Sequence, residues 1–344
     1  MITTWLFEFF HALRGAAAQQ PQAIQDHYRW YLGLWTRAEQ RGFDGIFFSE
    51  HHFGAGYAPS PNLLVANVAA RTTRLRLGVL GVSTPYSSPW RVVEEFAMLD
   101  HLTGGRFEPG LVSGIPPELG FAGIAADVAL ARHEAIATAV EGFMRDGSVT
   151  AHGGGWSIDD LTIFPSMYQR PGHVWTACRS RATAEVAARR GWKVCTGFNS
   201  TESIADMFDG YRAAATEAGH PATADRLGLR RMVTFVDDAS QQRAGVHAGK
   251  RHLLDVLNAS AGPLPPFAAL LDRPDETSSV LSDDEFVSGT PEQVAAELIR
   301  QCRAVGASNM LVAFGAIEPS QVEAAHQIFA ERVLPALHEA EVVG

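Results

Sequence analysis

Residues 43–53 read FDGIFFSEHHF, a short apolar run, residues 45–48, that ends in a cluster of polar and ionisable side chains. Helix-like patterns flank this stretch at residues 25–41 and 60–71. A short apolar run between two longer amphipathic segments is typical of a strand in a βαβ unit. The stretch therefore predicts a parallel sheet with ionisable side chains at the carboxyl end of one strand.

The same alternation repeats along the chain. It predicts strands at residues 3–8, 45–48, 75–82, 107–112, 174–177, 194–196, 229–236 and 309–314. It predicts helices at residues 25–41, 60–71, 89–102, 128–145, 181–190, 201–218, 291–305 and 319–338. Eight strand–helix units are the number that closes a (β/α)₈ TIM barrel, an α/β fold. A doubly wound sheet is the alternative, but it needs a glycine-rich turn after the first strand, and residues 7–14 contain no glycine.

Two segments are longer than a minimal barrel needs, and both are predicted insertions at the carboxyl-terminal face. Residues 149–166 contain three consecutive glycines and predict a β-hairpin or a loop. Residues 258–288 are rich in Pro, Ser and Asp and predict a mobile lid that orders when a ligand binds. No internal repeat or linker interrupts the pattern, so residues 1–344 are expected to form a single domain.

Composition restricts the partners and the compartment. The formal net charge is −10 and no basic run occurs, which argues against nucleic acid as a partner. The three cysteines show no CxxC spacing, so neither a disulfide framework nor a zinc site is expected. No signal peptide and no apolar run of membrane-spanning length is visible. The expectation is a cytoplasmic protein that binds neither nucleic acid nor membrane.

The cluster Glu50-His51-His52 is the first catalytic candidate, because active sites of TIM barrels lie at the carboxyl ends of the strands. Imidazole titrates near neutral pH and can serve as acid, base or hydrogen-bond donor. A structural or surface histidine pair is the alternative. Successive side chains of an extended segment face opposite ways, so the two histidines are not expected to share a metal ion, and no metal site is predicted.

Two further stretches suggest contact with a ligand. Gly78 and Gly81 lie in the third predicted strand, where a glycine indicates either the close approach of a flat ligand or a requirement of barrel packing. Ser180 and Thr183 lie where the fifth strand meets a helix, a position that suits a phosphate. Ordinary capping of that helix by the two hydroxyl groups is the alternative.

Taken together, six sequence blocks resemble the bacterial luciferase-like, flavin-dependent monooxygenase family. They run in the family's order over nearly the whole chain: FDG followed by EHHF (43–53), ARTTRLRLG (70–78), SPWRV (88–92), LDHLTGGRF (99–107) and GTPEQV (289–294). The resemblance implies a TIM barrel, commonly a homodimer. It implies reduced FMN and O₂ forming a flavin C4a-peroxide, with F420 as the hydride-transferring cofactor of some relatives.

The resemblance also implies roles for individual residues. His51 corresponds to the histidine beside the isoalloxazine, and Glu50 accompanies it as a catalytic candidate. Leu80 and Gly81 fall where relatives have a non-prolyl cis peptide beside the flavin. Cofactor-binding positions at the phosphate are Arg132, Ser180 and Thr183. The chain departs from the family at Val112, which replaces a flavin-proximal cysteine of the luciferases, and at Ser113, which replaces a phosphate-binding arginine; Arg179 or Arg181 is expected to compensate.

These observations lead to a two-component FMNH₂-dependent monooxygenase that oxidises a small organic substrate and takes its flavin from a separate flavin reductase. An F420-dependent oxidoreductase and a non-catalytic flavin-binding protein are the alternatives. His51, rather than His52, is predicted to be catalytic, and His52 to pack sideways or pair with a carboxylate. Aromatic side chains at strand ends are predicted to line the substrate pocket, namely Phe7, Phe9, Phe10, Tyr57 and Trp175.

Overall fold

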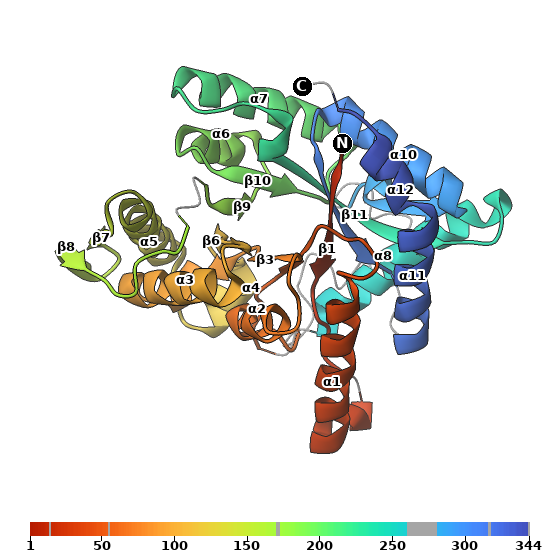
Figure 1. Cartoon of the computed structure of the whole chain (residues 1–344), viewed down its shortest axis with the longest axis horizontal. Helices are drawn as coiled ribbons and strands as arrows, with labels where there is room; N and C mark the ends of the chain where they lie inside the picture. The colour runs from red at the N-terminus through yellow and green to blue at the C-terminus, as the bar shows by residue number, and fades with distance from the viewer. Residues whose placement is uncertain (14, 54–55, 170–172, 260–280, 316–317, 343–344) are drawn as a thin grey trace.

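The chain folds into a nearly closed barrel of eight parallel strands in a computed structural model that describes residues 1–13, 15–53, 56–169, 173–259, 281–315 and 318–342 (Figure 1). The eight strands are β1 (Thr3–Glu8), β2 (Gly45–Phe48), β3 (Arg76–Val79), β5 (Phe107–Glu108), β9 (Trp175–Ala177), β10 (Lys193–Thr196), β11 (Leu227–Phe235) and β13 (Asn309–Phe314). Their order is β5-β3-β2-β1-β13-β11-β10-β9. A parallel bridge between Gly110 and Trp175 connects the two ends, so the predicted eight-stranded barrel is confirmed.

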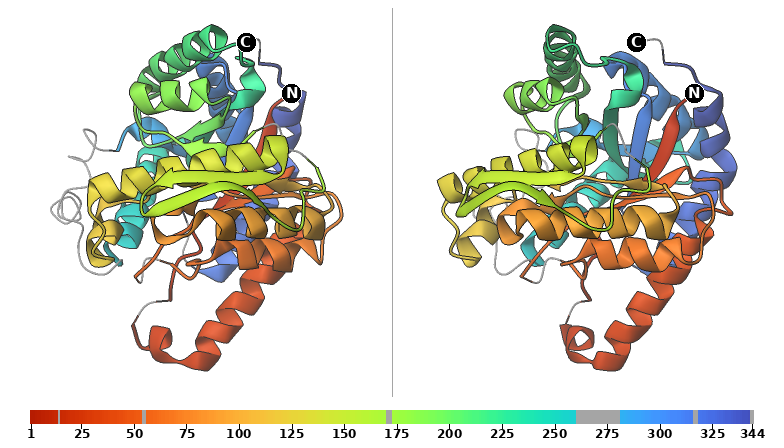
Figure 2. Two further views of the ribbon diagram at one scale, coloured as in Figure 1. Left: turned by 90° about the vertical axis from the view of Figure 1, so that its left-hand side faces the viewer. Right: turned by 60° about the vertical axis from the view of Figure 1, so that its left-hand side comes forward.

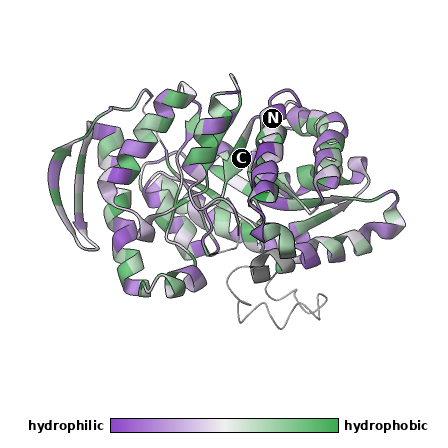
Figure 3. Cartoon of the chain, turned by 90° about the horizontal axis from the view of Figure 1, so that it is seen from below, coloured by the Kyte–Doolittle hydropathy of each residue, from purple (hydrophilic) through white to green (hydrophobic). Residues whose placement is uncertain are grey.

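Helices surround the barrel on the outside, as the two turned views show (Figure 2). They are α1 (Pro21–Arg37), α2 (Pro61–Ala69), α3 (Pro89–Thr103), α4 (Pro116–Phe121), α5 (Ala126–Asp146), α6 (Arg181–Arg189), α7 (Thr201–Glu217), α8 (Gln242–Ala259), α10 (Pro291–Val305), α11 (Pro319–Arg332) and α12 (Leu334–Glu339). Hydrophilic and hydrophobic residues alternate along them, as expected for helices with one buried face (Figure 3). No helix within the described ranges has the length and apolar composition needed to cross a membrane.

The inside of the barrel is filled by large side chains. Buried side chains from several strands pack there in one cluster: Trp5, Phe7, Phe47, Leu80, Trp175, Cys195 and Leu311. Gly78 belongs to this packing, because a Cβ atom at its position would lie 2.4 Å from the ring of Phe47. Of the two explanations for Gly78, barrel packing is therefore supported by the structure. A second, larger cluster fills the space between the strands and the surrounding helices.

The two predicted insertions have different outcomes. Residues 148–162 form an antiparallel hairpin of β7 (Ser148–Gly153) and β8 (Trp156–Thr162), as expected. Most of the predicted lid lies outside the described residues. Its last part was predicted wrongly, because β12 (Phe286–Gly289) is a buried strand paired in parallel with β11. The sequence pattern also missed α4 and α8.

Candidate active site

The two histidines that follow β2 contact different carboxylates. His51 Nδ1 lies 3.1 Å from Glu118 Oε1, and His52 Nε2 lies 2.9 Å from Glu50 Oε1. The histidines thus use different ring nitrogens and different partners, as expected for successive residues of an extended segment. The prediction that His52 pairs with a neighbouring carboxylate is confirmed, and that carboxylate is Glu50.

Glu118 is a site residue that the sequence did not indicate. It lies in the short helix α4, which follows β6 (Leu111–Val112), and its side chain is buried. A buried carboxylate needs a hydrogen-bonding or charged partner, and His51 provides one. By holding Nδ1, Glu118 fixes the orientation of the His51 ring and directs Nε2 to other groups. His51 therefore has the geometry of an oriented acid–base residue.

The surroundings of His52 favour its charged form. Its hydrogen bond with Glu50 raises the pKa of His52, while burial opposes this increase. The His52 ring also packs edge-on against Tyr86, with the ring centroids 4.7 Å apart. Burial, together with the charges of Glu118 and Glu50, raises the pKa of Tyr86 to about 12. This arrangement binds Glu50 and His52 to each other, so Glu50 contacts the second histidine rather than His51.

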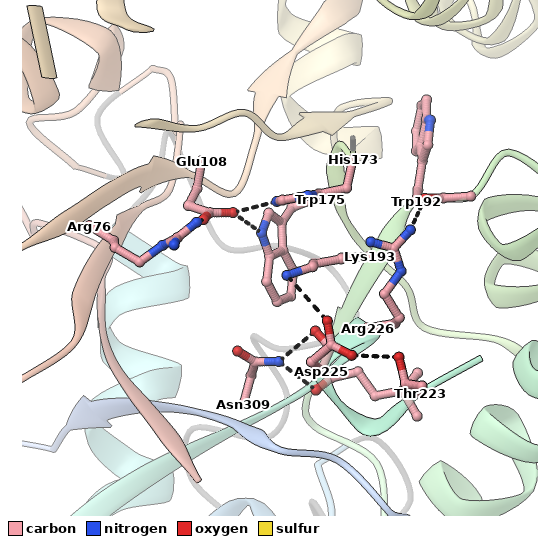
Figure 4. A network of polar contacts seen from close by, with 12 residues as sticks. Arg76, Glu108, His173, Trp175, Trp192, Lys193, Thr223, Asp225, Arg226 and Asn309 are labelled. Carbon is pink, nitrogen blue, oxygen red and sulfur yellow. Dashed lines mark hydrogen bonds and ion pairs between the residues drawn. The ribbon is translucent and has the colours of Figure 1, made fainter. Parts of the chain in front are cut away.

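Aromatic rings connect His51 to the inner wall of the barrel. The Phe9 ring lies 6.0 Å from the His51 ring and 5.0 Å from the Phe7 ring, measured between centroids. Five aromatic residues were predicted to line a substrate pocket, and for Trp175 this prediction is wrong. It lies at the start of β9, at the amino-terminal end of the barrel, where its indole nitrogen donates to Glu108 (Figure 4).

The peptide bond between Leu80 and Gly81 is cis, as predicted. A Cβ atom at Gly81 would lie 2.7 Å from the backbone nitrogen of Leu111, so this glycine is required by the close approach of two backbones. The next residues form β4 (Val82–Ser83), which pairs with β6. The cis peptide therefore lies beside the end of the strand that contains Val112.

Arg132 reaches this region from helix α5. Its Nη1 donates to the carbonyl oxygen of Pro85 at 2.8 Å, and its guanidinium lies over the ring of Trp156. The hydroxyl of Thr84 donates to the carbonyl oxygen of Val112 at 3.1 Å. The structure thus brings four of the predicted cofactor positions to one side of the barrel mouth: Leu80, Gly81, Val112 and Arg132.

Ser180 and Thr183 cap helix α6. The Ser180 side chain accepts from the backbone nitrogen of Thr183, and the Thr183 side chain accepts from the backbone nitrogen of Ser180. The two hydroxyl groups are also 3.0 Å from each other. This is the capping arrangement given above as the alternative to a phosphate site. That Ser180 and Thr183 join Arg132 in binding a phosphate remains a prediction.

The two arginines expected to compensate for the missing phosphate-site arginine have different environments. Arg181 is exposed and pairs with Glu185 and Asp206 on the outside of the barrel. Arg179 lies over the ring of Phe198, with 4.9 Å between the guanidinium carbon and the ring centroid. Burial, and then the positive charge of Arg230, lower the pKa of Arg179. Arg179 is therefore the better placed of the two for an anion in the barrel mouth.

Comparisons with known proteins identify the family. Residues 6–309 match the model of the luciferase-like monooxygenases. The chain belongs to the luciferase-like monooxygenase family. An uncharacterised protein, y4wF of Sinorhizobium fredii, is 32% identical over 304 residues, which cover 85% of this chain and 87% of that protein. Limonene 1,2-monooxygenase of Rhodococcus erythropolis is 26% identical, over 83% of this chain and 74% of its own length.

Solved structures share the fold of this luciferase-like chain. Monooxygenase RslO1 from Streptomyces bottropensis has a TM-score of 0.80 at 24% identity, covering 97% of this chain and 99% of its own. An oxygenating constituent of 3,6-diketocamphane monooxygenase from Pseudomonas putida, in complex with FMN, has a TM-score of 0.75 at 17% identity, covering 98% of both chains. An F420-dependent secondary alcohol dehydrogenase has a TM-score of 0.75 at 15% identity, covering 98% and 99%. The fold is thus shared by proteins with either cofactor.

The luciferase-like chain shows no arrangement for a metal among its described residues, where no three His, Cys, Asp or Glu side chains are placed to hold one ion. It does have a second titratable pair at the carboxyl end of β1. His326 Nε2 lies 3.9 Å from Glu8 Oε1, beside a cavity of about 30 Å³. Burial raises the pKa of Glu8 to about 8. Burial, aided by Arg41, lowers the pKa of His326 to about 3, so both groups are uncharged near neutral pH.

This pair predicts how stability depends on pH. Folded Glu8 binds one proton more than unfolded Glu8 between pH 4.5 and pH 8, so its contribution to stability is lost as the pH rises through that window. Between pH 5 and pH 8.5 the free energy of unfolding of Glu8→Gln is expected to rise by about 1–3 kcal/mol relative to that of the original chain, since one pKa unit is worth about 1.4 kcal/mol. The range is below the full value because the Glu8 side chain is 13% exposed. Urea unfolding at both pH values measures this difference.

His326 changes stability in the opposite direction and at lower pH. Unfolded His326 binds the extra proton between pH 3 and pH 6.5, so its contribution grows as the pH rises through that window. His326 is present in both proteins, so its own contribution to stability cancels when Glu8→Gln is compared with the original chain. Parallel stability curves for the two proteins between pH 5 and pH 8.5 would show that Glu8 is already ionised in the fold.

Proposed function

We propose that this chain is the oxygenase of a two-component system that takes reduced FMN from a separate reductase and oxidises a small organic substrate with O₂. The observation that carries the proposal is the oriented His51–Glu118 pair, placed at the carboxyl ends of the strands next to the aromatic residues Phe7 and Phe9. Bound FMNH₂ would supply the two electrons that reduce one oxygen atom of O₂ to water while the other enters the substrate.

The residues beside the cis peptide fit a flavin phosphate. The Nε atom of Arg132 is buried and has no hydrogen-bond partner among the described residues, while Nη1 is already fixed to the Pro85 carbonyl. A buried guanidinium nitrogen without an acceptor is costly, and a phosphate oxygen is a strong acceptor for it. Arg132 would bind the phosphate, with Ser180 and Thr183 at the amino terminus of α6 as the other donors.

Arg132→Ala is expected to weaken FMN binding about 10–100-fold, because a hydrogen bond to a charged group is worth about 1.5–3 kcal/mol. Titration of FMN fluorescence measures the change. Riboflavin lacks the phosphate and serves as the control ligand, whose binding should change little in the same variant. Arg181→Ala, which removes an exposed arginine of the same region, should leave both ligands unaffected. An equal loss for FMN and riboflavin would exclude a phosphate contact.

The second candidate function is hydride transfer with F420, supported by the structural likeness to the F420-dependent alcohol dehydrogenase. The fold alone does not separate the two cofactors. Monooxygenation is preferred because a relative sharing most of this chain's length is named limonene 1,2-monooxygenase. Two-component action is supported by the sequence, in which no glycine-rich nicotinamide-binding turn occurs after the first strand.

The decisive experiment is an anaerobic titration of the purified chain with FMNH₂ and, separately, with reduced F420. Each complex is then mixed with O₂ in a stopped-flow spectrophotometer. The proposal predicts tight binding of FMNH₂ and oxidation of the bound flavin at a rate that differs from that of free flavin. Binding of reduced F420 alone, stable to O₂, would replace the proposal with hydride transfer. Binding of FMNH₂ without any change in its reaction with O₂ would favour a non-catalytic flavin-binding protein.

A further inference from the structure

Arg230 places a buried positive charge at the mouth of the barrel. It lies on β11, and its side chain is only 5% exposed. Nη2 forms an ion pair with Glu285 Oε1 at 2.5 Å that lacks hydrogen-bond geometry. Nη1 has no hydrogen-bond acceptor among the described residues, and the only acceptor near Nη2 there is this carboxylate oxygen. A guanidinium presents five donors, so this burial leaves binding capacity unused.

Three aromatic rings surround the Arg230 guanidinium. Its central carbon lies 4.2 Å from the ring centroid of Phe198, 5.6 Å from that of Phe9 and 5.7 Å from that of Phe7. Gly197 makes room for the group, because a Cβ atom at its position would lie 2.7 Å from Nη2. The geometry is a planar cation held between apolar walls, which suits a planar ligand that carries a negative charge.

Positive charge exceeds negative charge around this group. Arg230 and Arg231 both pair with Glu285, which is fully buried and also accepts from the backbone nitrogen of Phe198 at 2.7 Å. Arg179 approaches Phe198 as well, and the charge of Arg230 contributes to lowering its pKa. Glu285 thus pairs with two buried guanidinium groups, and Asp284 adds a second negative charge near Arg231, while Arg179 brings the guanidinium groups to three. Uncompensated buried charge is costly, and an anionic ligand would offset it.

The position of Arg230 around the barrel indicates which ligand it meets. The cis peptide follows β3 and Ser180 follows β9, and these strands flank β5 at the place where the barrel closes. Arg230 on β11 and Phe7 on β1 belong to the other side, where only β13 separates their strands. A flavin between β3 and β9 would leave the side of β1 and β11 to the substrate.

We infer that Arg230, with Phe7, Phe9 and Phe198, forms a subsite for the carboxylate or phenolate group of a planar organic substrate. The inference rests on the proposed function, because it assigns the substrate class of the same site. Arg230 would hold the anion between the aromatic walls, and the attached ring system would extend toward His51 along Phe9. The substrate would accordingly be an unsaturated or aromatic acid rather than a neutral hydrocarbon.

The test measures binding of benzoate, cinnamate and salicylate, each compared with its neutral amide, by calorimetry on the full chain with and without FMN. At least one acid should bind about 10–100-fold more tightly than its amide, the usual range for a hydrogen bond to a charged group. Arg230→Gln should remove that preference and leave the amide affinity within about 3-fold. Arg190→Gln, which alters a half-buried arginine paired with Glu134 and Glu141, is the matched control.

Two further variants keep the test valid if Arg230→Gln alone destabilises the fold. Arg230→Met removes the charge with an apolar side chain of similar length, and Glu285 keeps its ion pair with Arg231 and its hydrogen bond from the backbone nitrogen of Phe198. Gly197→Ala keeps the charge but displaces the guanidinium, and it should reduce the preference for acids while the protein remains folded. Thermal unfolding of each variant is measured beside the binding.

The outcomes separate this inference from the proposed function. Equal affinity for every acid and its amide in the original chain, with normal FMN binding, would overturn the subsite and leave the proposed function intact. Loss of FMNH₂ affinity in Arg230→Gln with the preference for acids unchanged would assign the guanidinium to the flavin and overturn the inference. A preference for acids that depends on Arg230, in a chain that binds no flavin, would support the subsite and contradict the proposed function.

Discussion

His51→Ala is expected to lower the rate of the reaction about 10²–10⁴-fold, the usual contribution of a positioned acid–base group. Glu118 holds Nδ1 of His51, so Nε2 is the nitrogen that would hold or deliver a proton at the reacting oxygen. Flavin affinity should change far less, because the predicted phosphate contacts come from Arg132 and α6. The measurement is single-turnover oxidation of the FMNH₂ complex, with product yield determined for a substrate of the class inferred above.

His52→Ala is the matched control for this prediction. His52 has the same side chain, is adjacent in sequence and pairs with Glu50, so its loss should affect stability more than turnover. Glu118→Gln keeps the size of the carboxylate and should give an intermediate loss, since it alters the partner that orients His51. Full product yield from His51→Ala, with the loss appearing in His52→Ala, would reverse the assignment of the two histidines.

The barrel could be predicted because most of its strands and helices have a recognisable pattern in their own local sequence. Residues 291–305 show this most clearly, since Thr290 and Pro291 predicted the start of α10, and the structure places a capping box and a first-turn proline there. Elements that depend on tertiary contacts were missed. Strand β12 lies in a polar stretch and is a strand only because β11 pairs with it.

Helix α8 was missed for a related reason. It contains two glycines, which lower helix propensity. One of them, Gly245, is required by packing, because a Cβ atom there would lie 1.9 Å from the Ser288 hydroxyl on β12. The local sequence therefore argues against the helix, while contact with Ser288, 43 positions later in the chain, requires a small residue in it.

The sequence indicated the site residues that directly follow a predicted strand, and it missed the others. His51 and Glu50 follow directly on an apolar strand, so position alone indicated them. Glu118 lies in a helix of six residues that begins with two prolines, and nothing in the sequence links it to His51 across 67 positions. Arg230 was hidden inside a predicted strand, where the alternation of side chains does not reveal which face points into the barrel mouth.

Glu108→Ala is expected to destabilise the fold by about 1–3 kcal/mol, the usual cost of leaving a buried donor without its acceptor. Glu108 is 1% exposed at the amino-terminal end of the barrel, where its Oε2 accepts from Trp175 Nε1 at 2.7 Å and contacts His173 Nε2 at 2.8 Å (Figure 4). Its Oε1 pairs with Arg76. The alanine variant would leave the arginine charge and the indole N–H without their acceptor.

This prediction separates the two ends of the barrel. The Glu108 cluster lies at the face where TIM barrels place stabilising rather than catalytic residues, so flavin binding by the folded variant should be unchanged. Asp26→Ala removes a carboxylate from an exposed pair with Arg29 and should cost no more than about 0.5 kcal/mol. Urea unfolding of both variants gives the comparison. If Glu108→Ala and Asp26→Ala unfold at the same urea concentration, water must replace Glu108 as the acceptor for Arg76, His173 and Trp175. The amino-terminal end of the barrel would then be hydrated rather than closed.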